Sequence, residues 1–144
     1  MSLYIDTSCL LKLLWPEPET ARTEALVDAE ELVVVSDLAR LEMLVQVRAR
    51  RAAGLLTRRG DARLVRQLDA LIATPPFELR ACAPGLIEDA RVQVAAALPR
   101  AHCRTLDRLH LAAMAGMGLS RLLTNDDDQA RAARVLNVRV LLPR

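Results

Sequence analysis

Short apolar runs recur along this 144-residue chain, and most are followed by a segment with helical spacing. A strand that is covered on both faces of a sheet is apolar at nearly every position, so such runs predict buried strands. The clearest run is LVVV at 32–35. The other predicted strands lie at 3–5, 121–123 and 138–142, with a weaker candidate at 77–82.

Apolar residues three and four positions apart predict the helices. Ser36 or Asp37 can cap the helix that follows the second strand. Gly54 and Gly60 are expected to punctuate a linker. The predicted helices are a short one through Leu14 that Pro16 breaks, 20–30, 38–45, 64–72 ending before Pro75, one from Pro84 through Leu98, 105–115 and 127–136.

Strands that alternate with helices predict an α/β fold with a central, mainly parallel sheet of four to five strands flanked by helices. The length fits a single domain spanning 1–144. Parallel sheets of this kind bind ligands beyond the carboxyl ends of their strands. Residues that directly follow a strand are therefore the first candidates for function.

Four acidic residues stand among apolar ones at this predicted edge. Asp6 ends the first strand, Glu42 lies in the second turn of the helix after the second strand, Asp107 lies in the first turn of the helix at 105–115, and Asp126 follows the fourth strand. Four carboxylates in one dry pocket need raised pKa values or bound cations. Oxygen ligands suit Mg²⁺ or Mn²⁺, and such ions activate water for hydrolysis of a phosphodiester.

Each acid also has a purely structural interpretation. Asp6 could be a turn residue, and Asp107 could stabilise the start of its helix through the helix dipole. Glu42 lies beside Leu41 on an apolar stripe, where an ionised acid without a partner would be costly. Arg40 is too near in sequence to face Glu42, so a metal, or else a distant arginine, is expected as its partner.

The sequence contains further candidates for binding. His110, one helical turn after Asp107, is expected to be a packed or hydrogen-bonded histidine rather than a metal ligand or a general base. The arginines of segment 48–66 could contact phosphates, although a solvated face is favoured for most of them.

Three consecutive aspartates follow the fourth strand at 126–128. On a helix that starts here, successive side chains diverge by about 100°, so the three cannot point at one ion. Asp126 is assigned to the metal and can also cap the helix, with Gln129 as a capping-box partner. Asp128 is the second choice, as a ligand through water, and Asp127 is expected to face solvent near the helix start.

The composition argues against several classes of protein. A net charge of +2, from 20 basic and 18 acidic groups, does not fit a highly basic nucleic-acid coat, and an aromatic content of 2% argues against a platform that stacks successive bases. No apolar run approaches 18 residues, so no membrane-spanning helix is expected. MSLYIDTS lacks the basic and apolar regions of a signal peptide, so none is expected. Three cysteines without C-x-x-C spacing argue against a disulfide framework or a zinc site, so a cytoplasmic location is expected.

Four segments, in this order, resemble the PIN-domain ribonucleases, and above all the VapC toxins of bacterial toxin–antitoxin pairs. The segments are YIDTS (4–8), SDLARLE (36–42), LDRLHLAA (106–113) and LLTNDDDQARAA (122–133). The resemblance covers nearly the whole chain and implies that Asp6, Glu42, Asp107 and Asp126 are the catalytic and metal-binding acids. It also implies that Thr7 and Ser8, and Thr124 of the T-x-D motif, are supporting hydroxyls beside those acids, although Thr7 and Ser8 could equally be helix caps.

By the same resemblance, the protein would be a Mg²⁺- or Mn²⁺-dependent endoribonuclease that cleaves tRNA or ribosomal RNA. It would be a growth-inhibiting toxin, blocked by a cognate antitoxin, and would form a homodimer. The alternative is a non-catalytic RNA- or protein-binding module with a degenerate metal site.

Two other acidic α/β folds do not fit the residues. A phospho-acceptor receiver domain needs a lysine after its last strands, and Lys12 is the only lysine in the chain. A haloacid-dehalogenase-type phosphatase needs D-x-D after its first strand, where this chain has Asp6 followed by Thr7 and Ser8.

Overall fold

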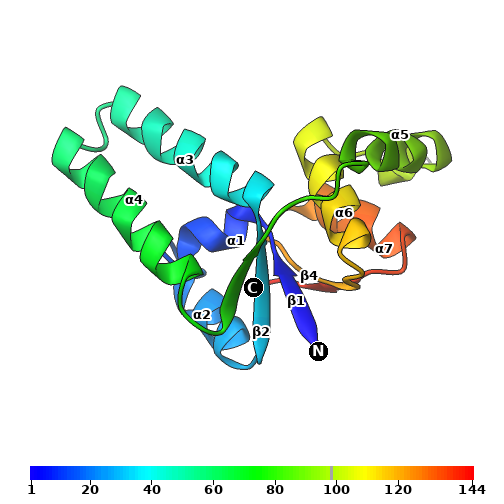
Figure 1. Ribbon diagram of the computed structural model, residues 1–144, viewed down its shortest axis with the longest axis horizontal. Helices are drawn as coiled ribbons and strands as arrows, with labels where there is room; N and C mark the ends of the chain where they lie inside the picture. The colour runs from blue at the N-terminus through cyan, green and yellow to red at the C-terminus, as the bar shows by residue number, and fades with distance from the viewer. Residues whose placement is uncertain (98) are drawn as a thin grey trace.

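The computed structural model describes residues 1–97 and 99–144, and a five-stranded parallel sheet lies at its centre (Figure 1). The strand order is β3-β2-β1-β4-β5, and every neighbouring pair is parallel. The predicted α/β fold is therefore confirmed, with five strands. They are β1 (Ser2–Ile5), β2 (Leu32–Ser36), β3 (Phe77–Arg80), β4 (Arg121–Leu123) and β5 (Arg139–Leu141).

Helices cover both faces of the sheet (Figure 1). One group, α1 to α4, lies on one side, and α5 to α7 lie on the other. The bounds are α1 (Thr7–Lys12), α2 (Thr20–Asp28), α3 (Asp37–Ala52), α4 (Arg58–Ile72), α5 (Leu86–Ala96), α6 (Thr105–Gly116) and α7 (Asp127–Val135), with a short 3₁₀ turn at Pro99–Ala101. None of the helices described is long and apolar enough to cross a membrane.

The two central strands send alternate side chains to two separate apolar cores. Leu3 and Ile5 of β1 are fully buried on the side of α1 to α4, whereas Tyr4 between them is buried on the side of α6 and α7. This is the period of two that a pleated strand imposes. Because both faces are covered, these strands are apolar without interruption, which is why they were recognisable in the sequence.

The connection between α3 and α4 is shorter than the sequence predicted. Helix α3 continues to Ala52, and α4 begins at Arg58. The hydroxyl of Thr57 accepts a hydrogen bond from the backbone N–H of Gly60 at 3.0 Å, so Thr57 caps α4 and Gly60 lies in its first turn. Gly54 does lie in the connection, with a φ of 76° that favours glycine.

Other predicted boundaries also shift. The weak strand candidate at 77–82 ends at Arg80, because the N–H of Cys82 donates to the Asp37 carboxylate at 3.0 Å and not to a neighbouring strand. The final strand covers Arg139–Leu141 and not 138–142. The helix predicted from Pro84 runs from Leu86 to Ala96, and its predicted end at Leu98 lies outside the described residues.

The strand order brings the predicted acids to one edge. The chain passes from central β1 to β2 on one side and later to β4 on the other, so a switch point lies between β1 and β4. The backbone N–H of Asp6 donates to the carbonyl of Leu123 at 2.9 Å, which joins the carboxyl ends of these two strands. Ligand sites of α/β sheets form at such a point.

Candidate active site

Asp6 is a buried carboxylate held by neutral donors. It follows β1 and caps α1, where its Oδ2 accepts hydrogen bonds from the Ser8 backbone N–H at 3.2 Å and the Ser8 hydroxyl at 2.8 Å. The Thr124 hydroxyl donates to the same oxygen at 3.3 Å, and Gln129 Nε2 donates to Oδ1 at 3.3 Å. The side chain is thus fixed from three directions by uncharged groups.

Glu42, in the second turn of α3, faces Asp6 across the edge of the sheet. Its Oε2 accepts hydrogen bonds from the Thr7 hydroxyl at 2.6 Å and from His110 Nε2 at 2.8 Å. Partial burial would raise the pKa of Glu42, but the hydrogen bonds from His110 and Thr7 outweigh it and hold this pKa below its usual value. Glu42 is therefore ionised at neutral pH.

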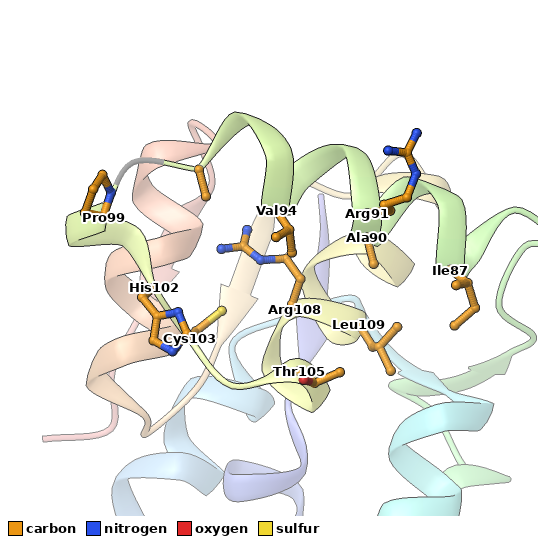
Figure 2. A pocket seen from close by; sticks show the side chains of 11 residues that line it. Ile87, Ala90, Arg91, Val94, Pro99, His102, Cys103, Thr105, Arg108 and Leu109 are labelled. Carbon is orange, nitrogen blue, oxygen red and sulfur yellow. The ribbon is translucent and has the colours of Figure 1, made fainter.

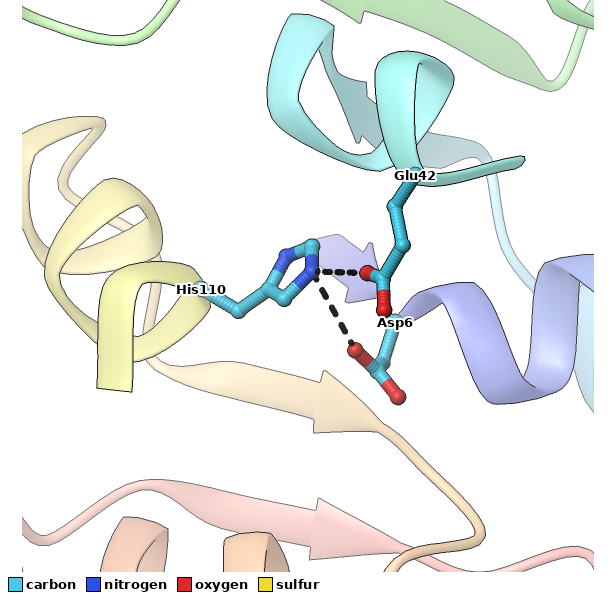
Figure 3. A group of neighbouring side chains, drawn as sticks. All are labelled: Asp6, Glu42 and His110. Carbon is cyan, nitrogen blue, oxygen red and sulfur yellow. Dashed lines mark hydrogen bonds and ion pairs between the residues drawn. The ribbon is translucent and has the colours of Figure 1, made fainter. Parts of the chain in front are cut away.

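His110 lies between these acids and the apolar core on the side of α6 and α7. It projects from α6, is 1% exposed, and points its ring at the Glu42 and Asp6 carboxylates (Figure 3). Nε2 lies 2.8 Å from Glu42 Oε2 and 3.7 Å from Asp6 Oδ1, and Nδ1 lies 2.7 Å from the Tyr4 hydroxyl. Burial alone would lower the pKa of His110, but Glu42, Asp6 and Asp107 together raise it.

Asp107 and Asp126 complete the acidic cluster and share an arginine. Arg104 Nε lies 3.2 Å from Asp107 Oδ2, and its terminal nitrogen lies 3.4 Å from Asp126 Oδ2. Burial raises the pKa of Asp107; Arg104 opposes this shift, whereas the charges of Asp126 and Asp6 add to it. The Arg104 side chain is 78% exposed, so it is a solvent-exposed counter-charge at the mouth of the cluster.

The four acids surround one small cavity. Its volume is about 190 Å³, and it lies where α1, α3, α6 and the loop before α7 meet at the edge of the sheet. The lining residues are Asp6, Thr7, Ser8, Leu11, Glu42, Gln46, Arg104, Asp107 and Asp126. All four predicted acids are therefore brought together, and carboxylate oxygens are the ligands that Mg²⁺ and Mn²⁺ prefer.

A larger cavity, of about 530 Å³, lies between α5 and α6 (Figure 2). Its walls are mainly apolar, with Ile87, Val94 and Leu109 among them, and it also holds His102 and Cys103. No carboxylate lines it among the described residues. It lacks the charged oxygens that phosphodiester chemistry needs, so the smaller cavity is the candidate active site.

The predicted supporting hydroxyls hold the acids in place. Thr7 donates to Glu42, and Ser8 donates to Asp6 while accepting the Asn125 N–H at 3.0 Å. Thr124 donates to Asp6 and accepts the Asp126 N–H at 3.1 Å. Each hydroxyl thus links two of the elements that carry the acids.

The three aspartates after β4 have separate environments. Asp126 lines the cavity and caps α7, where its Oδ1 accepts the Gln129 N–H at 2.8 Å. Asp127 pairs with Arg144 on the surface, and Asp128 pairs with Arg131 at 3.0 Å, with its side chain 63% exposed. The divergence expected of successive helical residues thus leaves Asp128 outside the cavity lining.

Two details differ from the predictions. Gln129 does not complete a capping box, because its side chain reaches Asp6 instead of the Asp126 backbone N–H. The expectation of a metal or a distant arginine as the partner of Glu42 did not include His110, which is hydrogen-bonded to Glu42 in the structure. Asp6, Glu42 and His110 each offer one ligand atom within 4.8 Å of the others, so the histidine also belongs to the group that could hold a metal.

Comparisons with known proteins agree with this geometry. Residues 3–135 match the PIN domain family. The chain belongs to the PIN-domain family. Over 144 residues this PIN domain is 30% identical to the ribonuclease VapC46 of Mycobacterium tuberculosis, an alignment that covers 99% of this chain and 98% of that protein.

Solved structures show the same PIN-like fold. FitAcB from Neisseria gonorrhoeae matches with a TM-score of 0.73 at 21% identity, covering 98% of this chain and 97% of that one. The sarcin–ricin loop cleaving toxin VapC20 of Mycobacterium tuberculosis matches with a TM-score of 0.68 at 19% identity, covering 90% and 94%. VapBC2 from Rickettsia felis, bound to a promoter DNA fragment, matches with a TM-score of 0.71 at 11% identity, covering 99% and 98%.

Proposed function

We propose that this PIN domain is a metal-dependent endoribonuclease and the toxin of a toxin–antitoxin pair. The observation that carries the proposal is the convergence of Asp6, Glu42, Asp107 and Asp126 on one small cavity at the switch point of the sheet. Membership of the PIN-domain family, with a relative named as a ribonuclease, supports the same function.

The donor set fits Mg²⁺ or Mn²⁺, and the four acids would hold one or two such ions. Four carboxylates face His110 and Arg104 as their nearby cationic partners, so the cluster keeps an excess of negative charge that favours a divalent cation. When bound, the metal would polarise water and neutralise charge on the phosphodiester.

The residues of this chain would orient the reaction. Thr7 and His110 hold the ionised Glu42, and Ser8, Thr124 and Gln129 hold Asp6, so neither carboxylate has to reorganise when substrate binds. Arg104 can turn its exposed guanidinium from Asp107 and Asp126 toward the scissile phosphate. Asp128 has no part in this arrangement, because it pairs with Arg131 outside the cavity.

We also propose the partners of this domain. The substrate would be tRNA or ribosomal RNA in the cytoplasm. An antitoxin would cover the acidic cavity with a basic side chain of its own, and FitAB and VapBC complexes are among the structurally similar proteins. Self-association to a homodimer would bury exposed apolar side chains of α5 such as Ile87, Val92 and Val94, and the mass of the purified protein in solution tests it.

A paired substitution experiment tests the proposed function. Wild type and the Asp6→Asn and Asp126→Asn variants are purified and assayed on total RNA with Mg²⁺ or Mn²⁺, and each is expressed without an antitoxin to follow growth. We expect wild type to cleave RNA and to arrest growth. Both variants should lose more than about 100-fold in cleavage rate, since losing even an outer partner of a metal ligand costs about 10–100-fold.

Asp128→Asn is the matched control. It removes one negative charge from the same run of three aspartates, at a position that does not line the cavity. It should retain wild-type cleavage. Equal growth arrest by wild type and Asp6→Asn would contradict the mechanism. Metal-independent RNA binding without cleavage would favour a non-catalytic binding module instead.

A further inference from the structure

Trp15 and Arg50 form a stacked pair beside the acidic cavity. The guanidinium carbon of Arg50, near the end of α3, lies 5.3 Å from the centroid of the Trp15 indole. The chain has three Phe, Tyr or Trp residues. Tyr4 is fully buried, and Phe77 packs against the apolar core on the side of α1 to α4. Trp15 belongs to neither core and is partly exposed, so its position is not explained by core packing.

Both members of the pair are tied to residues that line the cavity. Arg50 donates to the side-chain and backbone oxygens of Gln46 at 3.3 Å, and Gln46 lines the cavity. The backbone N–H of Trp15 donates to the carbonyl of Leu11 at 2.8 Å, and Leu11 also lines the cavity. Each member of the stacked pair therefore lies about one helical turn along the chain from a residue that lines the candidate active site.

The face of α3 that carries Glu42 also carries Arg50 of this pair. Glu42, Gln46 and Arg50 are four residues apart, so on an α-helix they lie within an arc of about 80°. Arg50 lies about 12 Å along the helix axis from Glu42, at a rise of about 1.5 Å per residue. A short stretch of single-stranded RNA that enters the cavity can span this separation.

The charge of Arg50 is free to bind an anion. Within the described chain no carboxylate lies within ion-pair distance of Arg50, whose hydrogen-bond acceptors are the two neutral oxygens of Gln46. The other arginines of α3 each have an acidic partner. Arg40 pairs with Asp69, and Arg48 and Arg51 pair with Asp61.

We propose that Trp15 and Arg50 form a subsite for a nucleotide that flanks the scissile phosphodiester of the RNA. Arg50 binds a phosphate of this nucleotide, and the uncovered part of the indole stacks on its base. The inference rests on the proposed ribonuclease function. One aromatic residue is too few for a platform that tracks a long strand, but it suffices for a single subsite.

Because Trp15 is the only tryptophan, its fluorescence reports this subsite directly. A mixed-sequence 20-nucleotide single-stranded RNA is titrated into wild type in a Ca²⁺ buffer, and a gel verifies that the RNA stays intact. We expect saturable quenching of Trp15 fluorescence. Trp15→Ala should weaken binding of the same RNA, labelled and followed by anisotropy, by about 5- to 150-fold, the range for loss of one base–aromatic stack.

Arg50→Ala tests the phosphate contact, and Arg134→Ala, an exposed arginine at the far end of α7, is its matched control. Arg50→Ala should make the slope of log K against log[salt] shallower by about 0.7, the value for one phosphate contact to a single strand. Arg134→Ala should leave this slope unchanged. In Mg²⁺, Trp15→Ala and Arg50→Ala should raise KM with little change in kcat, because they remove binding that is equal in the ground and transition states.

RNA that binds and is cleaved without changing Trp15 fluorescence would overturn the subsite and leave the ribonuclease function intact. Equal salt slopes for Arg50→Ala and Arg134→Ala would overturn it as well. A change of Trp15 fluorescence with a cognate antitoxin but not with RNA would reassign the pair to a protein partner. Absence of both RNA binding and cleavage would instead refute the proposed function itself.

Discussion

At the residue scale, the hydrogen bonds around His110 show which of its ring nitrogens carries a proton. Glu42 is ionised and can only accept, so His110 Nε2 carries a proton. The Ser36 oxygen accepts a hydrogen bond from the Ala39 N–H, so the Ser36 hydroxyl is free to donate to the Tyr4 hydroxyl. The Tyr4 hydroxyl can then donate to Nδ1 when the His110 ring is neutral. When the ring is charged, Nδ1 donates to Tyr4 instead. In both states the buried ring serves as a donor to Glu42.

The raised pKa of His110 predicts a pH dependence of stability in the metal-free protein. A histidine whose pKa is raised on folding stabilises the folded state fully below its unfolded value of 6.5, and this contribution is lost as pH rises through the folded pKa. The free energy of unfolding in EDTA should therefore fall as pH rises above 6.5. Urea unfolding at a series of pH values measures it.

His110→Gln is the control for this titration. Glutamine can still donate to Glu42 but does not titrate, so the decline above pH 6.5 should flatten whatever the absolute stability of the variant. A decline of equal steepness in both proteins would show that other groups cause it. Glu42 does not interfere, because its lowered pKa gives a contribution that is present above 4.5 and is lost only as pH falls further.

The four acids could be predicted because each directly follows or opens an element that local pattern identifies. Asp6 and Asp126 follow strands and cap the next helices, Glu42 lies in the second turn of α3, and Asp107 lies in the first turn of α6. The role of His110 could not be predicted, because it depends on how closely α6 and α3 approach across the sheet. A histidine on an apolar helix face has the same local pattern whether it meets a carboxylate or a core.

At the element scale, α3 and α4 form a helical pair joined by two kinds of ion pair. Asp61 of α4 is fully buried and contacts Arg48 and Arg51 of α3, whereas Asp69 pairs with Arg40 at 2.9 Å on the exposed surface. Sequence predicted both helices but not this difference in burial. Burial depends on the packing of Leu64, Leu68 and Ile72 against α3 and the sheet, which fixes the face that α4 turns inward.

Asp61→Ala and Asp69→Ala form a matched pair of substitutions on α4. Asp61→Ala should lower the free energy of unfolding by about 1–3 kcal/mol, because it removes the buried carboxylate that pairs with Arg48 and Arg51. The loss stays below that of a fully buried ion pair because both arginine side chains are exposed. Asp69→Ala should change it by about 0–1 kcal/mol, as for other surface ion pairs. Denaturant unfolding of the two variants compares them, and equal losses would show that burial of Asp61 has no energetic effect.

At the scale of the whole molecule, the acidic cavity joins parts of the chain that are distant in sequence. Asp6, Glu42, Asp107 and Asp126 come from β1, α3, α6 and the start of α7, and both faces of the sheet contribute. Sequence alone predicted the order of elements and the edge of the sheet where these acids meet. The strand order β3-β2-β1-β4-β5, with β1 at the centre, emerges only from the packing of both cores.

Because the acids belong to four elements, a metal that they bind should stabilise the entire fold. Mg²⁺ or Mn²⁺ at about 100 times its dissociation constant should raise the free energy of unfolding by about 2.7 kcal/mol, since it binds the folded protein in preference to the unfolded chain. The melting temperature with and without metal measures this effect. Asp107→Asn should show a smaller shift, and an equal shift would remove Asp107 from the site.

The spread of the acids along the chain also bears on how such a protein is made. Asp6 is translated well before Asp126 and the α7 helix that Asp126 caps. A nascent chain therefore cannot complete the cavity until Asp126 and α7 have been translated. Under the proposed function, RNA near a nascent chain that lacks Asp126 would meet only an incomplete site, and cleavage would begin only after α7 has packed against the sheet.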